Sequence, residues 1–410
     1  MSKIKKCASC GSYKVYLLLN LGSTPLANSF VEKKKELKKE KFYPLKLYIC
    51  KTCKLVQIFH SIKPSEFFIN YDYLSGASSS WIFHCKKYTK DIIKKYKLNP
   101  KIGDIIEIAS NDGTLIKNFY DKGFNVIGIE PSTIAHNIAK KKGINSINKF
   151  LDLKILKSIK KYNPQLIIAN NVIAHVKNIN NFVSALSKIS SKNTIITIEF
   201  PFVYNLVNKM QFDTIYHEHH YYFSLYSISK LLNRHGLELF DVEKISIHGG
   251  SYRIYVKTKN SNRKITKKVH NFLKFERQIN LNSRHYYKNY QRLVNQVKNK
   301  SVNLVKKLIS KNKTIHAYGA AAKGNTFLNF CKLNNNHINY IYDLNKTKVN
   351  KYLPGSHIKI LPVSKIKKKK PDFIIILPWN IFIEIKKQLA FTKKWGCKLI
   401  RLLPENKLLR

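Results

Sequence analysis

Two pairs of cysteines near the N-terminus constrain the fold of this chain more than any other feature. Cys7 and Cys10 form one C-x2-C pair, and Cys50 and Cys53 form a second. Four thiolates at this spacing can close a tetrahedron around Zn²⁺ at about 2.3 Å, with no open coordination position. The pattern therefore predicts a structural metal that contributes roughly 10 kcal/mol or more to folding. Four ordinary cysteines, or a redox dithiol, which needs only one pair, are the alternatives.

The 410 residues divide into three segments by their turns and their apolar periodicity. We expect a zinc-binding domain over residues 1–72, a larger domain over 73–305 and a third domain over 306–410. The second and third segments alternate strand-like apolar runs with helical patterns, which predicts mostly parallel sheets covered by helices. Polar, basic helices are expected over 264–311. The fold class is therefore α/β, with a small N-terminal zinc-binding domain.

A turn of small residues suggests a nucleotide-like ligand. The strand-like run 105–108 leads into the turn Ala109–Gly113, with a helix expected over 114–119, and the next strand-like run, 125–129, ends in Glu130. Ligands approach the backbone at the carboxyl ends of such strands, and a carboxylate there can accept hydrogen bonds from both ribose hydroxyls. A dinucleotide and S-adenosylmethionine fit equally well, and the lack of G-x-G-x-x-G favours the methyl donor. A structural turn without a ligand remains the alternative.

Histidines cluster after the fourth strand-like run of the second segment. The stretch 213–220 contains three histidines, Tyr216 and Glu218, and His175 follows the strand-like run 166–169. The spacing is not H-E-x-x-H, so proton transfer suits the cluster better than a metal does. An unperturbed histidine titrates near pH 6.5, where a general base is most effective. An exposed polar loop is the alternative.

The charge of the chain is a weaker guide than its size suggests. Lys and Arg number 75 against 23 Asp and Glu, a net charge of +52, which normally indicates nucleic acid or an anionic membrane. Only eight of the 75 are Arg, and none precedes Arg234. Nucleic-acid readers favour the guanidinium fork. Lysine together with abundant Asn and Ile is typical of drift in AT-rich coding sequence, which we prefer to a nucleic-acid function.

No targeting segment is predicted. The N-terminus, MSKIKKCASC, lacks an apolar signal core, and the longest apolar runs are far shorter than about 20 residues. We therefore expect a cytoplasmic protein without a membrane partner or a specific nucleic-acid partner, present as a monomer or weak oligomer.

Ten features occur in the order found in sugar C-methyltransferases, and the chain resembles that family over essentially its whole length. The family comprises enzymes similar to the tylosin-pathway and tetronitrose-pathway 3-C-methyltransferases of deoxysugar biosynthesis. The features are the cysteine pairs, LGSTPLANSF (21–30), YDYLSGASSS (71–80), EIASNDGTL (107–115), NNVIAHV (170–176), FDTIYHEH (212–219), HGGSYR (248–253), YGAAAKGNT (318–326), YLPGSHI (352–358) and LPWN (377–380).

The resemblance implies a zinc-binding N-terminal domain, a central Rossmann-like S-adenosylmethionine-dependent domain, and a C-terminal Rossmann-like domain that helps to hold a nucleotide-linked sugar. Many relatives have glycine in place of Ala109, a change expected to tighten the turn without abolishing binding. The implied zinc ligands are Cys7, Cys10, Cys50 and Cys53, and the implied donor-binding residues are Glu107, Ala109, Asn111, Gly113 and Glu130.

The resemblance also places a general base at His219, beside Tyr216 and Glu218, with His175 and a tyrosine nearby. That tyrosine is Tyr71 or Tyr73, and Tyr71 is preferred. The implied substrate is a dTDP-linked or other nucleotide-linked 4-keto-6-deoxy sugar. His219 would remove the C-3 proton, and Tyr216, helped by Tyr71 or His175, would stabilise the enolate oxygen.

Two remaining assignments stay open. Glu218 would orient His219 or contact the sugar, and Lys323 is either a diphosphate ligand or a surface lysine. Two other functions are carried as alternatives. A nucleic-acid-binding or nucleic-acid-modifying methyltransferase is suggested by the charge. A non-catalytic zinc scaffold would leave the His, Tyr and Glu cluster unexplained.

Overall fold

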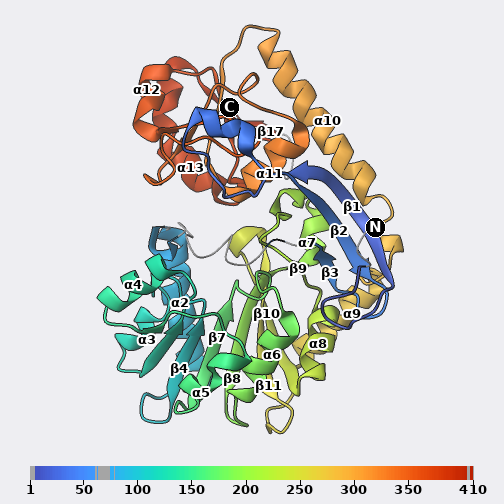
Figure 1. Ribbon diagram of the computed structural model, residues 1–410, viewed down its shortest axis with the longest axis vertical. Coiled ribbons are helices and arrows are strands. Elements are labelled where there is room, and N and C mark those ends of the chain that lie inside the picture. Colours follow the sequence, from blue (N-terminus) through green and yellow to red (C-terminus); the bar gives the residue numbers. More distant parts are fainter. Residues whose placement is uncertain (1–4, 61, 63–73, 78, 404–406, 410) are drawn as a thin grey trace.

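The computed structural model describes residues 5–60, 62, 74–77, 79–403 and 407–409, and over these residues the strands form three sheets. Figure 1 shows a central and a C-terminal α/β unit one above the other, with the N-terminal strands and the long helix α10 along one side. The α/β class is therefore confirmed, with an N-terminal unit that carries the four cysteines.

The N-terminal unit is a small antiparallel sheet in the order β1-β2-β3-β9. A 3-10 helix, Lys34–Lys39, lies between the first two strands. The last strand, β9, comes from the central part of the sequence and pairs with β3, a contact that the sequence pattern does not predict. The N-terminal sheet is thereby joined to the segment that carries the histidine cluster. The strands are β1 Val15–Thr24, β2 Tyr43–Cys50, β3 Val56–Ile58 and β9 Tyr221–Tyr222.

The central unit has the strand order β10-β11-β8-β7-β4-β5-β6. From β6 to β8 the strands are parallel in the doubly wound order 3-2-1-4-5, and β11 lies antiparallel between β8 and β10. Residues 105–108 are buried, as a sheet covered on both faces requires. The strands are β4 Asp104–Ile108, β5 Val126–Ile129, β6 Asn145–Ile147, β7 Pro164–Asn170, β8 Ile195–Pro201, β10 Leu237–Ile245 and β11 Ser251–Thr258.

Helices cover this sheet. The helix expected over 114–119 is shorter and begins later, because residues 109–116 form an extended turn before α3. The helices are α2 Ser79–Tyr96, α3 Lys117–Tyr120, α4 Thr133–Lys141, α5 Leu156–Ile159, α6 Ile179–Lys188, α7 Val203–Asn208 and α8 Leu225–Arg234.

The C-terminal unit repeats the same doubly wound order. Its sheet runs β14-β13-β12-β15-β16-β17, parallel except for β17 at the edge. The short strand β14 is not predicted by the sequence pattern. The elements are β12 Ile315–Tyr318, α11 Ala322–Cys331, β13 Tyr340–Asp343, β14 Lys359–Pro362, α12 Ile366–Lys369, β15 Phe373–Ile376, α13 Phe382–Gln388, β16 Lys398–Arg401 and β17 Lys407–Leu409.

Two helices connect the α/β units, as expected for 264–311. They are α9, Lys267–Gln278, and α10, Tyr290–Ile309. Helix α10 contacts β1, α11 and β12, so it touches both the N-terminal and the C-terminal units. One continuous apolar core includes Leu47, Ile198 and Leu328, one from each unit. The three units are therefore packed into a single structure.

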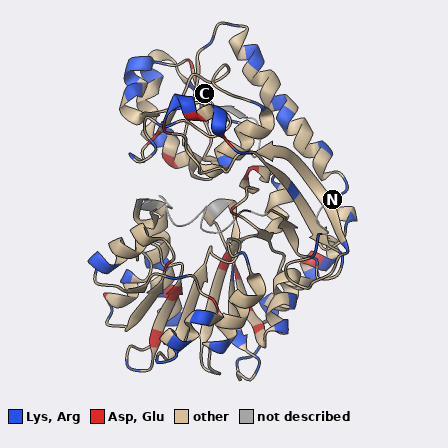
Figure 2. Ribbon diagram, in the orientation of Figure 1, with Lys and Arg blue, Asp and Glu red and all other residues tan. Residues whose placement is uncertain are grey.

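The basic residues are spread over the molecule. Figure 2 shows Lys and Arg on helices and loops of both α/β units and along the connecting helix. In this view the basic residues are not confined to a single helix or strand. Among the helices of the described residues, none has the length and apolar character needed to span a membrane.

Candidate functional site

A cleft of about 2290 Å³ lies between the two α/β units. From the central unit its walls include Ala109, which follows β4, and Asn170, which ends β7. From the C-terminal unit they include Lys323 and Trp379, which follow β12 and β15 respectively. In each sheet these are the two strands on either side of the point where the winding reverses. Doubly wound sheets bind ligands at the carboxyl ends of strands at this point. Two such ligand-binding edges therefore share one cleft.

The turn after β4 has an unusual backbone. Ala109, Asn111 and Gly113 have φ values of +56°, +50° and +76°, so alternate residues are left-handed. The backbone N–H groups of Ala109 and Ser110 donate to the Ile129 carbonyl at 2.7 and 3.3 Å. This geometry curls the turn beside the end of β5. Ala109 adopts a conformation that glycine reaches at lower cost, so the turn carries backbone strain at this position.

Two predicted donor-binding carboxylates hold this turn in place. The Glu130 oxygens accept backbone N–H groups of Asn111 at 2.8 Å and Ser132 at 2.7 Å, and burial raises the pKa of Glu130. Glu107 Oε2 accepts the N–H of Ile116 at 3.0 Å, and burial raises its pKa well above the usual range. Both residues line the cleft. Each carboxylate oxygen of Glu130 keeps a second lone pair for a ligand hydroxyl.

Residues 75 and 76 cover the turn from the other side. Ser75 N–H donates to Asn111 Oδ1 at 2.8 Å, and Gly76 N–H donates to Asp112 Oδ2 at 3.1 Å. Lys142 Nζ lies 3.2 Å from the same Asp112 oxygen. Sequence reasoning did not single out Asp112, although it lies within the EIASNDGTL motif. The predicted tyrosines, Tyr71 and Tyr73, lie outside the described residues.

The His219 ring is held in one tautomer. Its Nδ1 lies 3.0 Å from the Thr214 carbonyl oxygen, which can only accept, so Nδ1 carries the proton. Its Nε2 lies 2.7 Å from the Tyr216 hydroxyl, which donates to that nitrogen in the neutral state. Both side chains line the cleft. His219 Nε2 and the Tyr216 hydroxyl therefore form a pair through which a proton can move.

His175 packs against this pair. Its ring meets the His219 ring edge to face at 4.6 Å between centroids, and the Glu218 backbone acts to raise its pKa. Burial lowers the pKa of His175 to about 4, so the ring is neutral at neutral pH. The His220 N–H donates to the Ala174 carbonyl at 2.7 Å, which ties the histidine cluster to the turn after β7. Three predicted residues, His175, Tyr216 and His219, thus lie together.

The Glu218 carboxylate is hydrogen-bonded to Asn28 and not to His219. Asn28 Nδ2 lies 2.8 Å from Glu218 Oε1 and 3.0 Å from Oε2. Burial raises the pKa of Glu218 to about 7, while Asn28 and the Lys348 charge act to lower it. Of the two suggested roles of Glu218, this contact favours binding of the sugar over orienting His219, and both roles stay predictions. Asn28 belongs to LGSTPLANSF, but its contact with Glu218 spans the sequence and has no local signal.

Lys323 lies beside a buried contact between the two α/β units. Its Nζ lies 4.8 Å from the Trp379 ring centroid and donates to Asn380 Oδ1 at 3.2 Å. Trp379 Nε1 donates to Asp213 Oδ2 at 2.7 Å, and burial raises the pKa of Asp213 to about 6. A Cβ added at Gly249 would lie 2.4 Å from Trp379 Cη2, so the HGG motif permits this close approach. Lys323 therefore lines the cleft and is not a free surface lysine.

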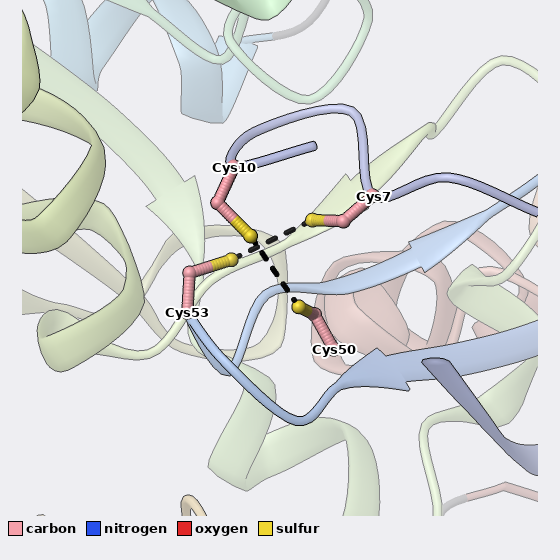
Figure 3. A group of neighbouring side chains, drawn as sticks. All are labelled: Cys7, Cys10, Cys50 and Cys53. Atoms are coloured by element: carbon pink, nitrogen blue, oxygen red, sulfur yellow. Dashed lines mark hydrogen bonds between the residues drawn. The ribbon is translucent and has the colours of Figure 1, made fainter. Parts of the chain in front are cut away.

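The four predicted zinc ligands converge (Figure 3). Their Sγ atoms all lie within 4.8 Å of one another, with Cys7 to Cys53 at 3.5 Å and Cys10 to Cys50 at 3.6 Å. A tetrahedron with zinc–sulfur bonds of about 2.3 Å has edges of about 3.8 Å. Hydrogen bonding between Cys7 and Cys53 lowers the pKa of Cys7 and raises that of Cys53, so one member of this pair favours the thiolate before a metal binds. The donor set fits a structural Zn²⁺.

Further contacts dock this cysteine corner on the central unit. Gln57 Nε2 donates to Cys7 Sγ at 3.2 Å and supports the ligand from the side. Arg234 donates to the Ser9 carbonyl at 2.9 Å, and Asn180 Nδ2 donates to the Ala8 carbonyl at 2.7 Å. The metal would therefore order a loop that packs on α6 and α8.

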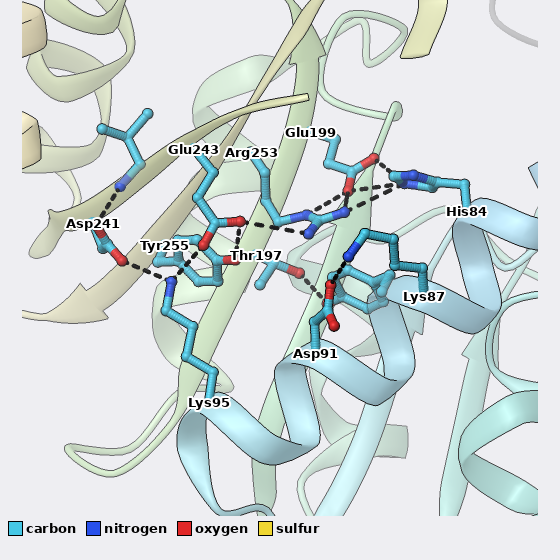
Figure 4. A network of polar contacts seen from close by, with 12 residues as sticks. His84, Lys87, Asp91, Lys95, Thr197, Glu199, Asp241, Glu243, Arg253 and Tyr255 are labelled. Carbon is cyan, nitrogen blue, oxygen red and sulfur yellow. Dashed lines mark hydrogen bonds and ion pairs between the residues drawn. The ribbon is translucent and has the colours of Figure 1, made fainter. Parts of the chain in front are cut away.

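A second polar network lines the cleft beside α2 (Figure 4). The Glu199 carboxylate, fully buried at the end of β8, accepts from Arg253 Nε at 2.6 Å and lies 3.1 Å from His84 Nε2. His84 and Arg253 hold the pKa of Glu199 below its usual range despite burial. Arg253 also stacks on Tyr88 at 4.5 Å. The network has no local sequence signal, because its members come from distant segments.

Three family models match consecutive parts of the chain. The "Putative zinc binding domain" matches residues 7–68, the "Methyltransferase domain" matches 84–242, and the "C-methyltransferase C-terminal domain" matches 246–404. C-methyltransferase NovU from Streptomyces niveus is 28% identical over 385 residues, which cover 93% of this chain and 91% of NovU. The similarity to a C-methyltransferase therefore extends over all three units.

Two solved methyltransferase structures are more distant. Magnesium protoporphyrin IX methyltransferase from Synechocystis PCC 6803, with bound S-adenosylhomocysteine, is 12% identical with a TM-score of 0.34, over 43% of this chain and 82% of that chain. An S-adenosylmethionine-dependent methyltransferase from Clostridium acetobutylicum is 14% identical with a TM-score of 0.35, over 42% and 90%. Likeness at this level supports no inference about function. The three consecutive domain matches and the NovU similarity show that the chain belongs to the S-adenosylmethionine-dependent C-methyltransferases.

Proposed function

We propose that this C-methyltransferase methylates C-3 of a nucleotide-linked 4-keto-6-deoxy sugar, through an enolate formed by His219. The observation that carries the proposal is the shared cleft. The hydrogen-bonded His219–Tyr216 pair and the turn after β4 both line it, and so does the ligand-binding edge of the C-terminal unit. The family resemblance supports the sugar class and the C-3 position.

The central unit would hold the methyl donor. Glu130, at the end of β5, has free lone pairs for a ribose diol, and the turn 109–113 brings backbone close to the ligand. S-adenosylmethionine supplies an electrophilic methyl group when bound. Glu107 would act indirectly, by holding the turn in shape through its hydrogen bond to the Ile116 N–H. The protein's part is to place a nucleophilic carbon in line with that methyl group.

His219 would accept the C-3 proton at Nε2. Thr214 fixes the proton on Nδ1, which leaves the Nε2 lone pair as the base. The C-3–H bond breaks, its proton passes to Nε2, and the electron pair delocalises onto the C-4 oxygen. The Tyr216 hydroxyl donates to Nε2 before reaction, so it would first turn from Nε2 to the C-4 oxygen of the substrate, which leaves the Nε2 lone pair open to the C-3 proton. Tyr216 would then already donate to the oxygen on which the enolate charge develops.

His175 would position the base. Burial keeps the His175 ring neutral at neutral pH, so the ring would bring no positive charge to an enolate. Its edge-to-face contact fixes the His219 ring plane instead. Tyr216 is then the main hydrogen-bond donor to the enolate oxygen. Glu218 keeps the other role suggested by the resemblance, a contact with the sugar.

The C-terminal wall would hold the diphosphate of the substrate, proposed here as dTDP-linked. Lys323, Lys348 and Lys351 line the cleft from this unit, and Lys323 lies in the first turn of α11, whose N-terminus lies at the ligand-binding edge. Cationic side chains and a helix N-terminus both favour a phosphate group. This local arrangement accounts for an anionic substrate better than the overall charge does.

A donor assay with competing acceptors tests the proposal. The purified protein is supplied with S-adenosylmethionine carrying a ¹³C-labelled methyl group and, separately, with a dTDP-4-keto-6-deoxy sugar, duplex DNA or RNA. We expect S-adenosylhomocysteine release only with the sugar nucleotide, and a ¹³C–C-3 coupling in the product. Release with DNA or RNA alone, or a label at another carbon, would contradict the assignment.

A further inference from the structure

The Glu218 carboxylate has one hydrogen-bonding partner among the described residues, and that partner comes from the N-terminal unit. Both carboxylate oxygens lie within 3.0 Å of Asn28 Nδ2, and Glu218 is 3% exposed. A carboxylate at this depth loses its hydration and depends on the protein for stabilisation. Asn28 therefore has a large influence on a group that directly precedes His219.

Asn28 belongs to a bridging segment, residues 25–40, which connects the N-terminal sheet to the C-terminal unit. The segment turns directly after β1, where Ser29 N–H donates to the Leu26 carbonyl at 3.2 Å. The carbonyl of Ala27, which directly precedes Asn28, accepts a hydrogen bond from Asn325 Nδ2 of α11 at 3.3 Å. Asn28 is thus placed by one contact within the segment and one with the C-terminal unit.

The rest of the bridging segment is attached firmly to the C-terminal unit. Val31 exchanges two backbone hydrogen bonds with Tyr352, at 3.0 and 2.8 Å. Glu40 accepts from the Gly355 N–H at 2.9 Å and from His357 Nε2 at 2.6 Å. Any shift of the C-terminal unit would therefore carry the segment, and Asn28 with it.

The charged and titratable neighbours of Glu218 are few. Lys348, from the C-terminal unit, acts on it through charge, and the neutral His175 ring contacts its main chain. Lys348 Nζ also donates to the Ala320 carbonyl at 2.9 Å and lies 5.1 Å from the Phe30 ring of the bridging segment. Asn28 and Lys348 both act against the rise in the Glu218 pKa that burial causes. Both effects thus depend on how the bridging segment packs against the C-terminal unit.

We propose that Asn28 is a positioning residue that fixes the orientation and the proton occupancy of the Glu218 carboxyl, and that the bridging segment couples this carboxyl to the placement of the C-terminal unit. The inference rests on the proposed function only in placing Glu218 within the reacting site. It adds that the N-terminal unit contributes the Asn28 side chain to the site.

A titration of the unliganded full-length enzyme tests the contact without a substrate. The Glu218 carboxyl band is identified in infrared difference spectra by its loss in Glu218→Gln. Asn28→Ala removes donors that stabilise the carboxylate, so the band should titrate at higher pH than in the wild type. Glu32→Gln is the matched control, because it removes an exposed ion pair of the same segment to Lys351 and leaves Asn28 in place. Unchanged titration in Asn28→Ala, or the same upward shift in Glu32→Gln, would overturn the proposal.

Kinetics distinguish positioning from a general structural effect. Asn28→Ala should lower kcat for the sugar nucleotide by about a hundredfold and move the pH-rate limb that Glu218 controls to higher pH. The affinity for S-adenosylmethionine and the melting temperature should stay near those of the wild type. In a Glu218→Gln background the same substitution should have little further effect. An equal loss in both backgrounds would show that Asn28 acts by another route.

A second substitution keeps the test open if the alanine variant is unstable. Asn28→Asp preserves shape but places two carboxyls together, which should raise the pH of titration further than alanine does. If the wild type turns over the sugar nucleotide and Glu218→Gln changes its pH profile, but Asn28→Asp does not, the inference fails while the proposed function stands. If Glu218→Gln has no effect on turnover, the placement of Glu218 in the site fails.

Discussion

The central and C-terminal units share a strand order and a local device. In each, an acidic residue at the end of the second strand accepts main-chain hydrogen bonds from the turn after the first strand. Glu130 accepts from Asn111 at 2.8 Å, and Asp343 accepts from Ala320 at 2.7 Å. The same topology thus produces the same edge twice, and both edges open onto one cleft.

The two edges differ in the side chains that they present. The central turn combines alternate left-handed residues with Glu107 and Glu130, whereas the C-terminal turn passes directly into α11 and presents Lys323. An acidic edge suits ribose hydroxyls and a cationic donor, and a basic edge suits a diphosphate. Strand order therefore locates a site, and the few residues after each strand determine what it can hold.

The largest effect should come from removing the metal that orders the N-terminal sheet beside both units. Cys50→Ser with Cys53→Ser removes half of the ligand set, and a structural zinc contributes roughly 10 kcal/mol or more to folding. We expect zinc content to fall to zero and amide exchange to rise sharply over 7–58. Cys331→Ser, a buried cysteine outside the quartet, is the control. Retained protection without zinc would contradict a structural metal.

The acidic residues test the division between the edges. Glu130→Ala should weaken S-adenosylmethionine binding about tenfold to a hundredfold, since it removes charged hydrogen-bond acceptors. The matched change, Asp343→Ala, should instead weaken binding of the sugar nucleotide. Calorimetric titration of each variant with each ligand measures both. If both variants lose affinity for the same ligand, the two edges do not have separate ligands.

The lysine at the C-terminal edge gives the next test. Lys323→Met should raise KM for the sugar nucleotide about tenfold while S-adenosylmethionine affinity is kept. Lys332→Met, at the far end of α11, changes the net charge equally and is the control. Steady-state kinetics at low and moderate salt compare the two. Equal effects from both substitutions would indicate that overall charge, rather than the edge, attracts the substrate.

The sequence predicted those parts of the molecule that depend on local spacing. The Cys7–Cys10 and Cys50–Cys53 pairs, and the strand and turn before Gly113, are set by residues close together in the chain. Periodicity also located most strands of both sheets. The helix after the turn begins later than predicted, since hydrogen bonds to Glu107 and Glu130 hold the turn open.

Contacts between distant segments had no such signal. Asn28 meets Glu218 across 190 positions, and His84 meets Glu199 across 115. A polar residue in a loop is common, and only the fold shows which one faces a buried carboxylate. The pairing of β9 with β3 was missed for the same reason, because a two-residue strand has no periodicity.

The smallest effect concerns the backbone of the central turn. Ala109 is left-handed, so Ala109→Gly should relieve strain and stabilise the fold by about 1 kcal/mol. Thermal unfolding measures this, and donor affinity should be kept. The comparison change Ala322→Gly, at the start of α11 in the other unit, has no left-handed strain to relieve and should destabilise slightly. Stabilisation by both substitutions would argue against strain at Ala109.

The central claim is that His219 removes the proton from C-3 before methyl transfer. Solvent exchange measures this step alone: the enzyme is incubated with a dTDP-4-keto-6-deoxy sugar in D₂O, and deuterium at C-3 is followed by NMR. We expect wild-type enzyme and His285→Asn, an exposed histidine outside the cleft, to exchange at similar rates. His219→Asn should exchange about a hundredfold or more slowly. Exchange at the wild-type rate in His219→Asn would contradict the account.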